Sequence, residues 1–426
     1  MSELDDLVAA CIAAPDDDAP RLVWADAVGG ERGELVVIQC RLAREDLPPA
    51  EAGALICRLD ELLETHGKSW SGFAENPAVR RCLFRRGFVE SVEADIITAP
   101  LPKLLERAPL LNALEVKGID QLVDYRKGPD RIGPDPLAVL AALFAHPLFT
   151  RLRAIGINDA YLYEYMGGDE WDNEWTSRAD EVCELIASSG KLAGMRSFAL
   201  RDRFSQRGMH ELLGSNLLAS VERLAFDMGS VDRSQARDLI AAMPNLRAIQ
   251  VGNQAIALRD IQDILPSTLV EIGGGILHYD DVTIFEAKVG PHIERMTANI
   301  PDSYATFSRL RSLDVRHAAI SGPSQGDAAY QRATAFAASP LPALRELHPF
   351  ADLTTDELLM IVEAFGAQLA CLDLTGTHQE ATPELRARVA GHIRTGPYRV
   401  SETFLEATTN TREPGLGCGL VTLRTS

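Results

Sequence analysis

The sequence predicts an α/β solenoid, in which short strands alternate with helices and stack into one elongated, curved layer. Three observations support this fold class. An apolar-x-x-apolar-x-apolar string recurs along most of the 426 residues, its spacing is nearly constant in the middle of the chain, and the stretches between its copies carry helical apolar patterns. Units of this size cannot bury an apolar face alone, so they stack on one another.

The recurring string predicts where the strands lie. Its clearest copies are Leu111-x-x-Leu114-x-Val116, Leu152-x-x-Ile155-x-Ile157, Met195-x-x-Phe198-x-Leu200, Val221-x-x-Leu224-x-Phe226, Leu246-x-x-Ile249-x-Val251, Leu310-x-x-Leu313-x-Val315 and Leu369-x-x-Leu372-x-Leu374. From Phe198 to Met296 its second apolar residue steps by 26, 25, 23 and 24 residues. This period is typical of leucine-rich repeats. We therefore predict a leucine-rich-repeat-like solenoid over residues 76–381.

Residues 1–75 lack the string and carry amphipathic helical patterns instead. The stretches 7–12, 21–26, 31–42 and 50–64 place apolar residues at helical spacing. The acidic run Asp16-Asp17-Asp18 precedes the second of them, where side-chain oxygens would accept the free amide protons of a helix N-terminus. We expect a small helical N-terminal domain over 1–75.

This N-terminal segment resembles the bacterial repeat-companion domain. The residues that carry the resemblance are Pro15 to Asp26, Arg32-Gly33-Glu34 and Gln39, within about the first 45 residues. The chain departs from the family pattern after Asp26, where Ala27-Val28-Gly29-Gly30 stands in place of the usual Trp-Leu-Glu-Glu. The resemblance implies that leucine-rich-type repeats follow, and it implies no catalytic activity.

The ends of the predicted solenoid depart from the regular period. We expect the first strand at 87–94 and its return helix at 100–108, where proline suits the first helical position. Insertions at Tyr125–Pro136 and Tyr161–Ser177 lengthen the next two repeats. Beyond residue 381 the string is lost, and we predict a helix over 383–394 with short strands at 400–404 and 420–423. Residues 382–426 are thus assigned to a C-terminal cap and tail.

Composition and charge argue against several classes of partner. The formal charge of -19 disfavours nucleic acid, because phosphate contacts need a basic face. We interpret the one basic cluster, Arg80-Arg81 with Arg85-Arg86, as a solvated edge where the repeats begin. No apolar run approaches the ~18 residues that span a bilayer, and the acidic start does not resemble a signal peptide. Seven scattered cysteines fit the reducing cytoplasm.

The concave side of the predicted solenoid is one candidate binding surface. Its central position holds, repeat by repeat, Glu115, Gly156, Ala199, Ala225, Gln250, Gly273, Thr297, Asp314, His348 and Asp373. The flanking charged candidates are Arg201, Arg223, Asp227, Glu271, Arg295 and Arg316. A floor of small residues with a rim of both charge signs suits a protein partner. The alternative is that these residues are merely solvated strand faces.

The insertion at Tyr161–Ser177 is the second candidate surface. Five aromatic residues alternate there with acidic ones: Tyr161, Tyr163, Tyr165, Trp171 and Trp175. Exposed aromatic residues are enriched at binding hot spots, and long insertions are often functional. The alternative is that these rings fold back and cover the neighbouring repeat.

Catalytic, metal and cofactor sites are not predicted. Cys371-Leu372-Asp373 matches the Cys-x-Asp of bacterial leucine-rich-repeat ubiquitin ligases, but it lies inside a repeat strand, so we interpret it as structural. The nine histidines are not paired at metal-ligand spacing. Gly273-Gly274-Gly275 lacks the Lys-Ser/Thr that completes a phosphate loop.

The sequence therefore favours a non-catalytic scaffold or adaptor that binds another protein. In the main alternative, the chain is a regulatory target whose exposed insertions, 125–136 or 161–177, are cleaved or modified by a partner enzyme. An enzyme is the third and least favoured class, because no set of nucleophile, base and orienting group can be assembled from the sequence.

Overall fold

The computed structural model describes residues 3–43, 47–95, 101–117, 136–158, 163–165, 175–177, 179–190, 193–201, 205–226, 233–251, 261–274, 283–297, 305–315, 325–350, 353–375, 377–396 and 418–422. Within them the chain is a mixed α/β fold built on one 14-stranded sheet, with a separate two-stranded sheet. The large sheet is open. Its outer strands, β15 (His392–Arg394) and β16 (Cys418–Thr422), each pair on one side, with β14 and β1 respectively.

Four helices come first, namely α1 (Glu3–Ala13), α2 (Asp18–Val28), α3 (Gly30–Leu42) and α4 (Pro49–Trp70). The side chain of Asp17 accepts a hydrogen bond from the Ala19 amide and caps α2, as the acidic run predicts. Gly29 and Gly30 have φ of 62° and 57°, so the glycine pair makes the tight corner between α2 and α3.

The main sheet begins with an antiparallel hairpin and continues as parallel strands. The hairpin consists of β1 (Val79–Arg85) and β2 (Phe88–Asp95). The parallel strands follow in chain order: β3 (Ala113–Lys117), β4 (Ala154–Asn158), β7 (Ser197–Arg201), β8 (Arg223–Phe226), β9 (Ala248–Val251), β10 (Glu271–Gly274), β11 (Arg295–Thr297), β12 (Ser312–Asp314), β13 (Glu346–His348), β14 (Cys371–Asp373) and β15.

The strands pair in the register that the repeated string predicts. The second apolar residue of each copy is the Cα partner of its counterpart in the next strand, as in Leu114 with Ile155, Ile155 with Phe198, and Phe198 with Leu224. These side chains are almost completely buried, because they point toward the helices. They belong to one apolar core that extends from α3 to β15.

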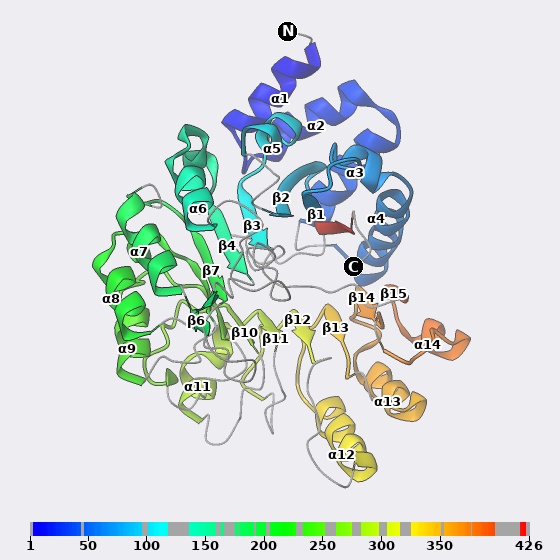
Figure 1. Ribbon diagram of the computed structural model, residues 1–426. Coiled ribbons are helices and arrows are strands. Elements are labelled where there is room, and N and C mark those ends of the chain that lie inside the picture. Colours follow the sequence, from blue (N-terminus) through cyan, green and yellow to red (C-terminus); the bar gives the residue numbers. More distant parts are fainter. Residues whose placement is uncertain are drawn as a thin grey trace.

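The helices between the strands cover the outer side of the curved row, while the strands line its inner side (Figure 1). These helices are α5 (Leu101–Arg107), α6 (Pro136–Ala145), α7 (Ala179–Ser189), α8 (Gln206–Gly214), α9 (Arg233–Ala241), α11 (Thr283–Lys288), α12 (Gln325–Ala337), α13 (Thr355–Phe365) and α14 (Pro383–Arg388). We call the side of the sheet away from these helices the inner face. None of the helices in the described ranges is long and apolar enough to cross a membrane.

Two expectations for the ends of the sheet are partly corrected. The first parallel strand lies at β2, as expected, but β1 precedes it and makes a hairpin that the sequence pattern does not predict. The helix expected over 383–394 ends at Arg388, and residues 392–394 form β15 instead. The chain is extended there because β15 pairs with β14, and Gly391 packs directly against the Ala370 carbonyl beside that pairing. The tail strand is present as β16, whereas 400–404 lies outside the described residues.

Helix α4 brings the two ends of the sheet together. It contacts β16 at one end and β14 and β15 at the other (Figure 1). Gly53 of α4 lies against Gly391, so closely that a Cβ on Gly53 would overlap the Gly391 backbone. A helix thus packs against both edge strands of the sheet, which is one way proteins protect strand edges.

Candidate functional site

The inner face presents the residues that lie between the apolar positions of each strand. The predicted central column is in register, since Glu115, Gly156, Ala199, Ala225, Gln250, Gly273, Thr297, Asp314 and His348 are successive Cα partners. Asp373 pairs in turn with Arg394 on β15. The column is therefore a continuous strip across the sheet.

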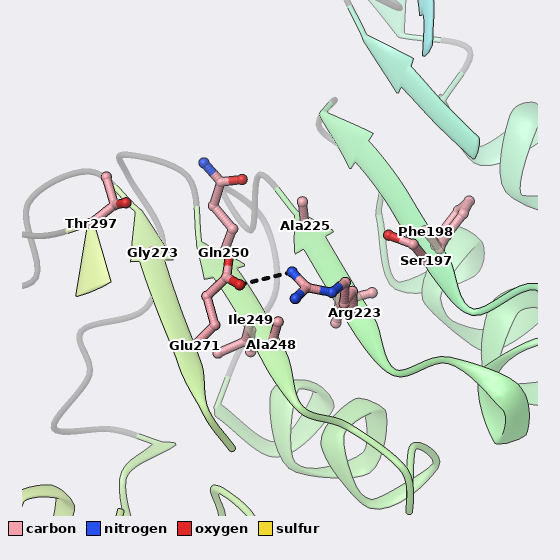
Figure 2. A pocket seen from close by; sticks show the side chains of 11 residues that line it. Ser197, Phe198, Arg223, Ala225, Ala248, Ile249, Gln250, Glu271, Gly273 and Thr297 are labelled. Atoms are coloured by element: carbon pink, nitrogen blue, oxygen red, sulfur yellow. Dashed lines mark hydrogen bonds and ion pairs between the residues drawn. The ribbon is translucent and has the colours of Figure 1, made fainter. Parts of the chain in front are cut away.

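A shallow, open hollow with a cavity volume of about 30 Å³ lies on the inner face over β7–β11 (Figure 2). Its floor consists of small residues, Ala225, Ala248 and Gly273, while Gln250 and Thr297 stand around it. Small side chains leave the strand backbone close to the surface, so a ligand or partner segment can approach it. The hollow coincides with the small, uncharged middle of the predicted column.

An ion pair crosses the hollow between strands that are not neighbours. Arg223 Nη1 lies 2.8 Å from Glu271 Oε2, and Ala248 of β9 is the register partner of both residues (Figure 2). The methyl group of Ala248 leaves the space in which the two long side chains meet. Burial opposes ionisation of Glu271, but the charges of Arg223 and Arg295 outweigh it and lower the pKa of this carboxyl.

A second polar cluster occupies the inner face at β13 and β14. His348 Nε2 lies 3.4 Å from Glu346 Oε1, and its Nδ1 lies 3.3 Å from Asp373 Oδ2. Burial alone would lower the pKa of His348, but Asp373 and Glu346 outweigh burial and raise it to about 9. The imidazolium in turn helps to hold the pKa of Glu346 and of Asp373 below the usual range. The cluster is therefore ionised near neutral pH.

The second cluster continues into α4 through Arg394. The Arg394 guanidinium makes two hydrogen bonds to Asp60, of 2.8 and 3.1 Å, and also lies 3.7 Å from Asp373. His392 Nε2 is 3.6 Å from the same Asp60 carboxylate. Local sequence patterns do not indicate this contact, because Asp60 and Arg394 are 334 residues apart.

The basic cluster at 80–86 is not the solvated edge that we expected. Arg85 and Arg86 are almost completely buried between the hairpin and the N-terminal helices. Arg80 pairs with Asp95 at 2.9 Å, and Arg81 donates a hydrogen bond of 2.7 Å to Glu93. Acidic partners thus neutralise the cluster: those of Arg80, Arg81 and Arg85 lie on β2, and that of Arg86 is Asp18 of α2.

The predicted binding residues fall into four groups. Arg223 and Glu271 meet at the hollow, and Arg295 lies close enough to influence Glu271. Arg201 ends β7 as the register partner of Asn158. Tyr163, Tyr165 and Trp175 belong to the antiparallel hairpin of β5 (Tyr163–Tyr165) and β6 (Trp175–Ser177), in which Tyr165 is opposite Trp175. Tyr161, Trp171, Asp227, Arg316 and the insertion at 125–135 lie outside the described residues.

The remaining candidates for chemistry are the Cys371 thiol and a metal site. Burial raises the pKa of the Cys371 thiol well above its usual value, so the thiolate that nucleophilic chemistry needs is disfavoured. Across the described ranges, no three His, Cys, Asp or Glu side chains are grouped so that they could hold a metal ion. No family model matches the chain, and no curated protein matches it.

Proposed function

We propose that the chain is a leucine-rich-repeat-like solenoid that serves as a non-catalytic scaffold or adaptor and binds another protein on the inner face of its sheet. The observation that carries this proposal is the hollow over β7–β11, with its floor of small residues. The inner face corresponds to the concave side of such a solenoid, and stacked repeats commonly use that side for binding.

The distribution of polar groups around the hollow supports a protein as the ligand. A partner loop can approach the small residues Ala225 and Gly273, beside the Arg223–Glu271 pair whose side chains meet at Ala248. Around this floor the Arg223–Glu271 pair, Gln250 and Thr297 offer charge and hydrogen bonds of both kinds. An uncharged centre with a polar rim is the usual anatomy of a protein–protein interface.

A non-catalytic role agrees with the state of the two best candidates for chemistry. His348 has a pKa of about 9, so its imidazole is protonated near neutrality and does not accept a proton as a general base would. Cys371 is fully buried in a strand, with a raised pKa. Both groups are accounted for by packing and ion pairing within the sheet.

We further propose that residues 1–75 act as the repeat-companion-like cap of the sheet. The motif residues attach the helices to the hairpin: Gln39 donates to the Phe84 carbonyl and accepts from the Gly87 amide. Gly33 lies against the Ala25 carbonyl, where a Cβ would overlap it. We also propose a cytoplasmic setting, which agrees with the six free cysteines of the described residues; subcellular fractionation tests it.

The test of binding is a quantitative pull-down from the native host's extract, read by mass spectrometry. The intact chain is compared with Ala225→Trp, which fills the hollow from its floor. Ala335→Trp makes the same change at an exposed position of α12 and is the matched control. We expect a stoichiometric partner that is retained by the control and reduced at least about tenfold by Ala225→Trp, the loss typical of a central contact.

A second variant separates the hollow from the aromatic insertion. The double change Trp171→Ala with Trp175→Ala removes two rings and leaves the hollow intact. Loss of the partner with this variant alone would move recognition to the insertion. A partner retained by both variants, or no stoichiometric partner at all, would contradict binding at the inner face.

A further inference from the structure

The outer edge of β1 is occupied by the last described segment of the chain. β16 pairs antiparallel with β1 over five residues, in the register Arg81 with Thr422, Cys82 with Val421, Leu83 with Leu420, Phe84 with Gly419 and Arg85 with Cys418. Figure 1 shows this strand beside β1, near the C-terminal end of the chain. The pairings of β1 with β2 and β16 are the antiparallel ones of this sheet, and its other pairings are parallel.

The β1 edge requires an occupant. With β16 in place, Cys82, Leu83 and Phe84 of β1 are fully buried. Buried backbone groups without partners are costly, and an uncovered strand edge readily adds another strand. Helix α4 contacts β16 and covers this end of the sheet from one side.

The occupant is held less firmly than any interior strand. β16 is hydrogen-bonded on one side, whereas every other strand of the large sheet except β15 is paired on both sides. Residues 395–417 of the sequence separate β16 from β15. The hydrogen bonds that five residues gain are offset by the conformational entropy they lose, so such a segment opens more easily than the core.

We propose that β1 is a strand-acceptor edge for an extended segment of a partner protein, and that the chain's own residues 418–422 occupy this edge in the partner's absence. Addition of a strand to a sheet edge is a general mode of peptide recognition, in which main-chain hydrogen bonds give affinity and the side-chain register gives specificity. This edge is distinct from the hollow, so the inference does not depend on binding at the inner face.

The register of β16 specifies what the partner segment presents. The position opposite Phe84 is Gly419, and the positions opposite Leu83 and Cys82 are the apolar Leu420 and Val421. An occupant therefore carries a glycine followed by two apolar residues in extended conformation. Because β16 belongs to the same chain, its docking is intramolecular, and a free segment competes against a high effective concentration.

The experiment uses a fluorescent peptide of residues 414–426, with Cys418→Ser to prevent disulfide formation. Its affinity is measured by anisotropy for the intact chain and for the full-length variant Leu420→Pro with Val421→Pro. Two prolines remove two backbone donors from β16 and free the edge. We expect the variant to bind the peptide at least tenfold more tightly than the intact chain does, and a Gly419→Val peptide to bind at least tenfold more weakly.

Controls make each outcome decisive. The change Arg424→Pro with Thr425→Pro places the prolines after the strand and should leave peptide affinity at the intact-chain level. Equal binding by the intact chain and the strand variant, or no binding by a folded strand variant, overturns the proposal. If dimers of the intact chain form by exchange of β16, the edge belongs to a second copy and the partner assignment is overturned.

If the strand variant does not fold, hydrogen exchange on the intact chain tests whether β16 opens more readily than the interior strands. We expect the amides of residues 419–422 to exchange at least tenfold faster than those of β8 and β9. Equal protection of these strands would mean that β16 is an integral strand, and the proposal would be wrong.

Discussion

The N-terminal helices hold the two ends of the sheet in different ways. At the hairpin end, Arg21 of α2 is 0% exposed and pairs with Glu90 of β2, which is 1% exposed, at 2.6 Å. At the other end, α4 meets β15 through a glycine–glycine contact and through Asp60 and Arg394, whose side chains are 19% and 20% exposed. The first contact is a fully desolvated charge network, and the second is a close backbone approach with an ion pair at its rim.

Because the two contacts differ, we expect different kinds of substitution to destabilise the two ends of the sheet. Arg21 also donates to the carbonyl oxygens of Pro15, Arg85 and Arg86, so its removal would leave Glu90 and three acceptors short of a donor. A buried charge that loses its partner is strongly destabilising, whereas a partly exposed pair contributes little. At the hairpin end, substitutions that remove a charge should therefore destabilise the fold most. At the end where α4 meets β15, which we call the α4 end, substitutions that add volume should destabilise it most.

The largest effect is expected from Arg21→Met. It removes the buried cation but keeps much of its volume, and we expect the free energy of unfolding to fall by about 3–5 kcal/mol. Urea denaturation followed by circular dichroism measures it. The double variant Arg21→Met with Glu90→Gln should not recover the full loss, because Arg85 also pairs with Glu90 at 3.3 Å and would lose that partner. A loss below about 1 kcal/mol for the single variant would show that the network is not a principal attachment.

The volume sensitivity of the α4 end is tested by Gly391→Ala. The added methyl group would overlap the Ala370 carbonyl and push β15 away from β14, so we expect a loss of about 2–3 kcal/mol. Gly214→Ala is the matched control, because a Cβ at Gly214 meets nothing within 4 Å. Thermal melts of the two variants should diverge. Equal melting temperatures would mean that β15 is not tightly packed.

The local parts of the fold follow from the sequence, and the contact between its ends does not. Strand positions and register are predictable because each copy of the string, such as that around Phe198, carries its own buried pattern. β1 is missed because Arg80 and Arg81 obscure its alternation, and their partners lie on β2. The meeting of Gly53 with Gly391 depends on curvature summed over the whole row of strands, which local patterns do not encode.

The candidate site was predictable to the same extent. The small middle of the inner face, from Ala199 to Gly273, could be placed because its register is local. The Arg223–Glu271 pair could not be specified, since it spans β9 and depends on the small side chain of Ala248. The sequence places Asp314, His348 and Asp373 in the central column. Their connection to Asp60 of α4 can be recognised only once the fold is known.

The stability of the sheet end that contacts α4 through β15 should depend on pH through His348. The pKa of His348 rises from 6.5 to about 9, with Asp373, Glu346 and Asp314 facing it and Arg394 beyond. A raised pKa contributes stability that is fully present below pH 6.5 and is lost as the pH rises through 9. We expect the difference in unfolding free energy between the intact chain and His348→Gln to shrink by about 2 kcal/mol from pH 6 to pH 10. A difference that is independent of pH would contradict the ionised cluster.

The smallest effect is expected from Asp60→Asn on α4. The amide keeps one acceptor for Arg394 but loses the charge that Arg394 and His392 share. We expect a loss of about 1 kcal/mol in urea denaturation, because Asp373 still lies near Arg394 and water reaches the pair. Glu61→Gln on the same helix is the control, since the Glu61–Arg58 pair is exposed and should contribute nothing measurable. If Asp60→Asn costs as much as Arg21→Met, charge rather than close packing holds the α4 end, and the contrast between the two ends disappears.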